Sequence, residues 1–112
     1  MQVVIAKFDC AYPEGLTSAK QRKLIRGLLD SLRSRLKCSI EYVEAHADAA
    51  SDFGIGLSFV LDGEAAPDSE TKFSEEVVDL IQRKGEVEVQ DYLCTVVNFD
   101  DLVDQEDLVT VH

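Results

Sequence analysis

Basic residues are concentrated in one segment of an acidic chain. Seven of its eleven Lys and Arg residues lie between Lys20 and Lys37, although the chain has 22 acidic residues and a formal net charge of −11. Aligned cations can bind phosphate groups, because each neutralised phosphate releases condensed counterions. On a helical wheel, five of the seven form a basic stripe beside an apolar face: Arg22, Lys23, Arg26, Arg33 and Lys37. The chemistry offered by this segment is the binding of anions.

Three interpretations of the basic stripe stay open. It could bind RNA or a ribosomal particle, it could pair with acidic groups of a protein partner or of the chain's own acidic C-terminus, or it could simply solvate a helix, as most charge runs do. Asp30 is the one acidic residue within the segment. Because acidic residues four positions from basic ones would stabilise a helix, their scarcity favours a binding role.

Other residues able to do chemistry lack a recognisable arrangement. Glu44, His46 and Asp48 alternate along an exposed strand pattern, but this is not a familiar metal-ligand spacing. The glycines at 54 and 56 lie inside a strand pattern instead of between a strand and a helix, so they do not form a phosphate loop. No nucleophile motif is present. The sequence therefore predicts a non-enzymatic protein with no catalytic residues, metal or cofactor.

The cysteines and the hydropathy indicate a cytoplasmic protein. Cys10, Cys38 and Cys94 are odd in number and widely spaced, which is typical of reduced thiols and not of a disulfide framework. No run of about 18 apolar residues is present, and the N-terminus lacks the features of a signal peptide. We expect a soluble chain with no membrane partner.

Hydrophobic periodicity predicts four strands and two helices. The strands are expected at 3–8, 37–49, 52–64 and 86–99. The first helix is expected to begin after Ser18, with Gln21 completing a capping box and Thr17 as the alternative cap. The second is expected to be capped by residue 68 or 69 and to end before Gly85.

This order of elements predicts an α+β fold of the ferredoxin-like kind. Its β-α-β-β-α-β arrangement forms a four-stranded antiparallel sheet with both helices on one face. We expect a single domain over 1–99 and an acidic C-terminal tail over 100–112. The small residues Gly54, Gly56 and Ser58 fall on the open sheet face, which makes it a possible interface for a homodimer or a protein partner. A small-ligand regulatory domain is a further alternative, from analogy between folds alone.

The chain resembles the YlxP-like family, small bacterial proteins grouped as a domain of unknown function. The resemblance covers most of residues 1–97 and is carried by the helix opening "TSAKQR" and the strand "KCSIEY". It departs from the family pattern at Ser18, Ala19 and Tyr42. The resemblance implies a ferredoxin-like fold without an established enzyme activity. It also implies a link to RNA or the ribosome, because the family's genes tend to lie near those of translation initiation and ribosome maturation.

Overall fold

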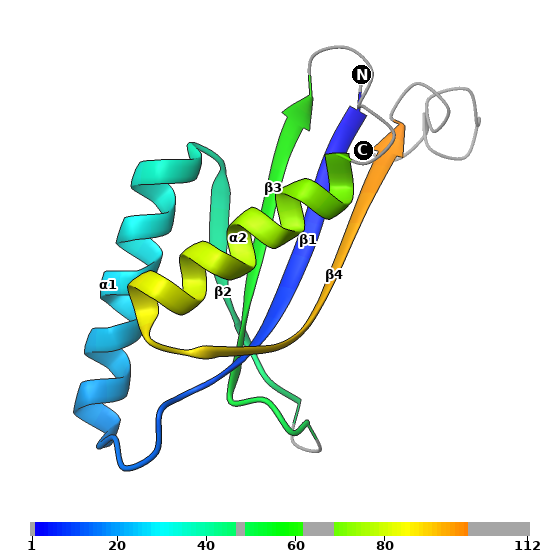
Figure 1. The fold of residues 1–112 in the computed structure, drawn as a ribbon. Coiled ribbons are helices and arrows are strands. Elements are labelled where there is room, and N and C mark those ends of the chain that lie inside the picture. Colours follow the sequence, from blue (N-terminus) through cyan, green and yellow to red (C-terminus); the bar gives the residue numbers. More distant parts are fainter. Residues whose placement is uncertain (1, 47–48, 62–68, 99–112) are drawn as a thin grey trace, which may run out of the picture.

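The computed structural model describes residues 2–46, 49–61 and 69–98. Six elements follow one another in the predicted order (Figure 1). They are β1 (Gln2–Ala11), α1 (Ser18–Leu36), β2 (Ser39–Glu44), β3 (Phe53–Leu61), α2 (Ser69–Gly85) and β4 (Glu88–Asn98). The predicted acidic tail at 100–112, the candidate metal ligand Asp48 and the candidate cap at 68 lie outside the described residues.

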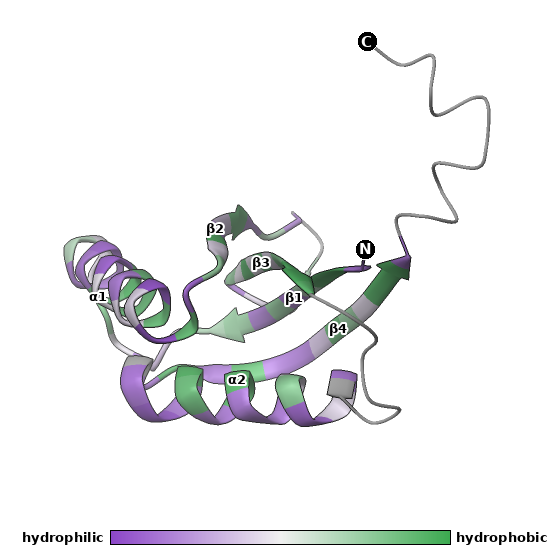
Figure 2. Cartoon of the chain, turned by 90° about the horizontal axis from the view of Figure 1, so that it is seen from above, coloured by the Kyte–Doolittle hydropathy of each residue, from purple (hydrophilic) through white to green (hydrophobic). Residues whose placement is uncertain are grey.

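The four strands form one antiparallel sheet in the order β2-β3-β1-β4. β2 and β3 are paired as a hairpin, and each helix connects two strands that are not neighbours in the sheet. Both helices lie on one side of the sheet, and no described element covers the other side (Figure 2). The predicted ferredoxin-like fold is therefore confirmed.

Alternation along the strands separates a helix-facing side from an open side. In β1, Val4, Ala6, Phe8 and Cys10 are buried, and in β3 the buried side chains Phe53, Ile55 and Leu57 face the same way. The first strand is longer than predicted because the alternation continues through the fully buried Cys10, past the end expected at residue 8. The core therefore lies between one face of the sheet and the two helices.

The apolar stripe of α1 supplies the other half of this core. Leu28, Leu29 and Leu32 are buried, and the flanking Leu24, Ile25 and Leu36 are partly buried against the same cluster. These six positions are the apolar face predicted from the spacing. From α2, Val77, Leu80 and Ile81 complete the cluster.

The prediction of Ser18 as the cap of α1 is wrong, and the alternative Thr17 is confirmed. The Thr17 side chain accepts a hydrogen bond from the amide of Lys20 at 3.2 Å, and its carbonyl accepts one from the amide of Gln21 at 2.9 Å. Thr17 has extended backbone angles, which leave its side chain free to reach the first turn, whereas Ser18 is already helical.

The end of α2 also differs from the prediction. Gly85 is the last helical residue, and the left-handed conformation expected of it falls on Glu86, with φ of 55°. A second non-glycine residue, Lys37, takes the same conformation at the end of α1. The end of α2 is therefore shifted by one residue, and Val87, which follows it, is buried in the core cluster.

Candidate functional site

A groove of about 650 Å³ separates α1 from the edge strand β2. Its lining comes from three parts of the chain: the loop after β1, one side of α1, and β2. The lining residues are Tyr12, Ser18, Gln21, Arg22, Ile25, Arg26, Leu29, Asp30, Arg33 and Tyr42. Three guanidinium groups thus lie beside apolar and aromatic side chains, with one carboxylate among them.

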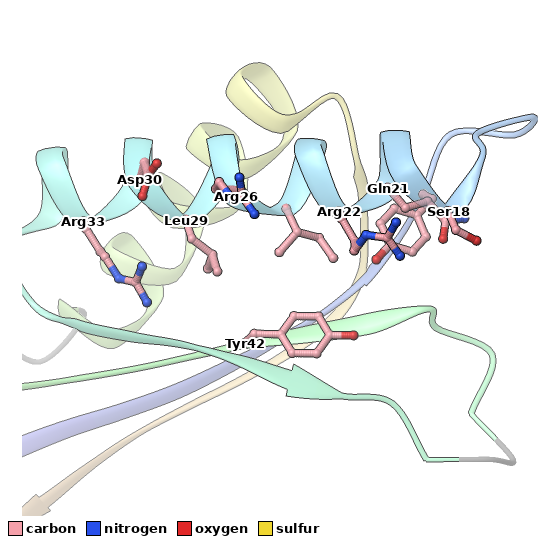
Figure 3. A pocket seen from close by; sticks show the side chains of 10 residues that line it. Ser18, Gln21, Arg22, Arg26, Leu29, Asp30, Arg33 and Tyr42 are labelled. Carbon is pink, nitrogen blue, oxygen red and sulfur yellow. The ribbon is translucent and has the colours of Figure 1, made fainter.

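The groove exists because α1 presents successive turns to β2. Positions three and four apart share one face of a helix, so Arg22, Arg26 and Arg33 follow the same side as Ile25 and Leu29. Figure 3 shows Leu29 and Arg33 extending from α1 toward β2, which carries Tyr42, and Arg22 nearer the start of the helix, beside Gln21. The helix therefore supplies both the charged and the apolar parts of one wall.

Two of the three arginines have no partner among the described residues. Arg33 donates from Nη2 to the backbone carbonyl of Ile40 at 2.8 Å, which ties α1 to the neighbouring strand. Among the described residues, the ion pairs are Lys7 with Asp9 and Arg83 with Asp79. Arg22 and Arg26 therefore have no acidic partner in that part of the chain, although the protein as a whole is strongly acidic.

An aromatic cluster forms the opposite wall. Phe53 is fully buried and lies between two tyrosines, with ring centroids 4.8 Å from Tyr12 and 6.1 Å from Tyr42. The Tyr42 ring is nearly parallel to that of Phe53, at 15°, yet Tyr42 remains 42 % exposed. The cluster fixes the ring from behind and leaves surface available toward the groove.

Two hydrogen bonds involving Asp52 hold Tyr12 at the end of the groove. Its amide donates to Oδ2 of Asp52 at 2.8 Å, and the amide of Asp52 donates to the carbonyl of Cys10 at 2.8 Å. Burial, together with Tyr42 and Asp52, raises the pKa of the Tyr12 phenol above its ordinary value. The phenol is therefore protonated at neutral pH and is able to donate a hydrogen bond.

The structure divides the predicted basic stripe into two groups. Arg22, Arg26 and Arg33 line the groove. Lys23 instead borders a separate shallow hollow near the end of α2, and Lys37 forms the left-handed cap of α1. All five side chains are exposed, and their joint use as a binding surface stays a prediction.

The groove also contains residues that the charge pattern did not select. Tyr12 and Tyr42 come from outside the basic segment, so no periodicity within α1 could point to them. The one available signal was the departure of Ser18 and Tyr42 from the YlxP-like pattern. Both of these residues line the groove.

The predicted sheet-face residues lie on the open side of β3, as expected. Gly54 is buried and Gly56 and Ser58 are partly buried. The backbone at Gly54 and Gly56 lies close to Val43 of β2, because a Cβ added at either glycine would be 3.3 Å from the Val43 side chain. Gly56 and Ser58 help to form a shallow, mostly apolar hollow, which Ile5, Lys7 and Val43 also border.

Thiols and metal ligands give no second site among the described residues. Cys10, Cys38 and Cys94 are free thiols. Within the described ranges, no three His, Cys, Asp or Glu side chains are grouped so as to hold a metal ion. No helix of the described part is long and apolar enough to cross a membrane.

Comparisons with solved structures agree with the fold. A DABB family protein with a ferredoxin-like fold from Mesorhizobium loti is 12 % identical, with a TM-score of 0.55 over 88 % of this chain and 97 % of that one. A putative chlorite dismutase is 11 % identical, with a TM-score of 0.57 over 95 % of this chain but 48 % of that one. A dimeric ferredoxin-like protein of unknown function from Thermobifida fusca is 15 % identical, with a TM-score of 0.44 over 86 % and 90 %.

The first two likenesses establish the ferredoxin-like fold alone, because the identities are very low. No family model matches the chain, and no curated protein matches it. The resemblance to the YlxP-like family therefore stays a prediction. Since one structure of this fold is described as an enzyme, the non-enzymatic function also stays a prediction.

Proposed function

We propose that the protein is a small binding module that forms a homodimer through the open face of its sheet. The observation that carries this proposal is a set of large apolar side chains on that face. Ile5 is 48 % exposed, Val60 56 % and Leu93 72 %. Exposed apolar side chains on a sheet face that no described element covers mark an interaction surface, because covering them with another apolar face removes them from water.

A second copy suits this face because its two halves are complementary. Leu93 projects from the edge strand β4, and the hollow beside Gly56 lies two strands away. Both residues are paired with Lys7 of β1, so they lie at the same level along the strands. A two-fold axis running along the strands between two facing sheets would place the raised side of each copy over the hollowed side of the other.

The charges on the open face are compatible with self-association. Lys7 lies 3.5 Å from Asp9, and Glu41 of β2 is in register with Gly56. The axis that places Leu93 over the hollow passes through β1, so β1 of one copy faces β1 of the other, and the ion pair of Lys7 with Asp9 leaves that contact without net charge. Glu41 lies on the outermost strand β2, beyond the partner's β4 in this arrangement, so its carboxylate stays in water at the rim.

The prediction is tested by the mass of the protein in solution. Leu93→Asp should shift the wild-type dimer toward monomer and raise its dissociation constant by about tenfold or more, because an apolar contact is lost and a charge is buried. Sedimentation equilibrium over a concentration series measures this shift. Thr71→Asp is the matched control, because it adds the same charge at an exposed position of α2 and should leave the dimer intact.

A wild-type protein that stays monomeric at every concentration would contradict the homodimer. Equal weakening by both variants would also contradict it, since the effect would then follow net charge and not the sheet face. Leu93 is mostly exposed, so its replacement should not unfold the monomer. Circular dichroism checks that both variants keep the native secondary structure.

The association of the basic stripe with RNA or a ribosomal particle stays a prediction. Its support is the exposure of all five basic side chains, four of them on α1 and the fifth, Lys37, at its C-cap. Cations aligned along one surface bind the phosphates of a nucleic-acid backbone, which is the physical ground for this prediction.

A further inference from the structure

The groove between α1 and β2 combines cationic groups with an apolar slot, an arrangement that solvation alone does not require. Ligand sites are usually concave and mostly apolar, with a few polar groups that fix the orientation of the ligand. We propose that this groove binds a small organic anion, whose carboxylate is held by Arg22 and Arg26 and whose apolar body lies against Tyr42 beneath Ile25 and Leu29. This inference is independent of the homodimer.

The binding site for the anionic group follows from two guanidinium groups that have no partner in the part of the chain that the structure describes. Arg22 and Arg26 are four residues apart on α1, so their side chains leave the helix on the same face one turn apart. Each guanidinium group can bind a carboxylate by donating two parallel hydrogen bonds to it. Arg33 already donates to the carbonyl of Ile40, so it closes the far end of the groove without being needed for the anion.

The slot for the apolar body follows from the aromatic wall. The Tyr42 ring is stacked on Phe53, remains 42 % exposed and lies opposite α1 (Figure 3). Ile25 and Leu29 face that ring from the helix. A flat or branched hydrocarbon group between them would remove apolar surface from water on both sides, and the ring would offer an offset-stacked contact to an aromatic ligand.

The same observations favour a single small anion over a polyanion. The groove has two arginines without a partner within the ranges 2–46, 49–61 and 69–98, and Asp30 adds a negative charge to its lining. The net charge of −11 repels a nucleic acid at long range, whereas it acts far less on a ligand with one charge. An apolar wall contributes nothing to a phosphate backbone but strengthens the binding of an amphipathic acid.

The test uses 2-naphthoate, which carries one carboxylate on a flat apolar body. Isothermal titration of the wild-type protein should give saturable binding with one site per chain. The double variant Arg22→Gln/Arg26→Gln should bind at least about tenfold more weakly, because it loses the charge-assisted hydrogen bonds. The matched control Lys20→Gln/Arg35→Gln removes the same charge from exposed positions of α1 outside the groove, and its affinity should stay within about twofold.

Two further probes separate the two halves of the site. The neutral analogue 2-naphthalenemethanol lacks the anion, and inorganic phosphate lacks the apolar body, so each should bind about tenfold or more weakly than 2-naphthoate. The proposal would be overturned by the absence of saturable 2-naphthoate binding, or by equal losses in the two double variants. It would equally be overturned if phosphate or the neutral alcohol bound as tightly as the acid.

Discussion

At the scale of single residues, the thiol of Cys10 has the clearest environment. It is fully buried on the helix-facing side of β1, where its Sγ lies 3.7 Å from the carbonyl of Phe8 as a weak hydrogen-bond donor. Burial, with a further contribution from Asp9, raises the pKa of this thiol to about 12. An unfolded chain would release this proton near pH 8.5, because that is about the ordinary pKa of a cysteine. The native state therefore keeps the proton to a higher pH.

This pKa difference predicts a loss of stability at alkaline pH. The contribution of protonated Cys10 to the free energy of unfolding is fully present below about pH 8.5. It declines by at most about 1.4 kcal/mol per pH unit as the pH rises toward 12, because the unfolded state loses the thiol proton at a lower pH than the native state. Cys10→Ala removes the thiol and with it this dependence. Urea unfolding at several pH values from 8 to 10 measures the free energy of unfolding of both proteins. The excess of the wild type over Cys10→Ala should shrink as the pH rises, and an excess that does not change with pH would contradict the prediction.

The sequence identified the charged residues of the groove but not its shape. The helical spacing predicted a stripe that contains Arg22, Arg26 and Arg33. It placed Lys23 and Lys37 in the same stripe. Periodicity describes one helix at a time, so it could not distinguish the side that faces β2 from the rest of the exposed surface. Tyr42 enters the site through the packing of an edge strand against α1, a long-range contact that no local pattern contains.

At the scale of elements, both helices end on a side chain in an unfavourable backbone conformation. Lys37 after α1 and Glu86 after α2 have φ of 50° and 55°. Glycine adopts this left-handed conformation without the steric cost that a Cβ brings. The helix ends are therefore places where the sequence is not optimal for its own fold.

We predict that Glu86→Gly stabilises the protein by about 0.5 to 1 kcal/mol, because it relieves the strained helix end. The matched control is Glu88→Gly, two residues later. There the backbone belongs to β4, and glycine should instead lower the free energy of unfolding by about the same amount. Urea denaturation measures both, and a loss of stability in the two variants alike would contradict the proposed strain.

The elements themselves could be predicted because their periodicities are strong. Alternation in β3 and the six apolar positions of α1 assigned both the structure and the buried face correctly. The ends of elements were less accurate, since they depend on single residues with competing partners. Thr17 and Ser18 are both good caps by type, and only backbone geometry selects Thr17. Gly85 is a favoured helix end by type, yet the burial of Val87 places the turn one residue later.

At the scale of the whole molecule, the two proposed surfaces lie on different sides of the sheet. The apolar side chains Ile5, Val60 and Leu93 are on the open face, whereas the groove lies on the helix-covered side. No residue lines both the groove and the hollow beside Gly56. Dimer formation and anion binding should therefore be separable functions of the same small fold.

This separation predicts that variants in one surface leave the other unchanged. Leu93→Asp should keep its 2-naphthoate affinity within about twofold of the wild type even when it is monomeric, because changes at distant sites without shared partners are usually independent. Arg22→Gln/Arg26→Gln should likewise remain dimeric. Titration calorimetry and sedimentation on the same preparations provide both readings, and joint loss of the two properties would contradict independent surfaces.

The arrangement of the tyrosines has a spectroscopic consequence. The chain contains no tryptophan and three tyrosines, so its ultraviolet emission comes from tyrosine alone. Tyr12 and Tyr42 line the groove, and the third, Tyr92, lies against Phe8 with ring centroids 5.9 Å apart. Two of the three tyrosines therefore lie where a ligand bound in the groove would change the quenching of their fluorescence. Binding to the groove can thus be followed by the fluorescence of the native protein, without any label.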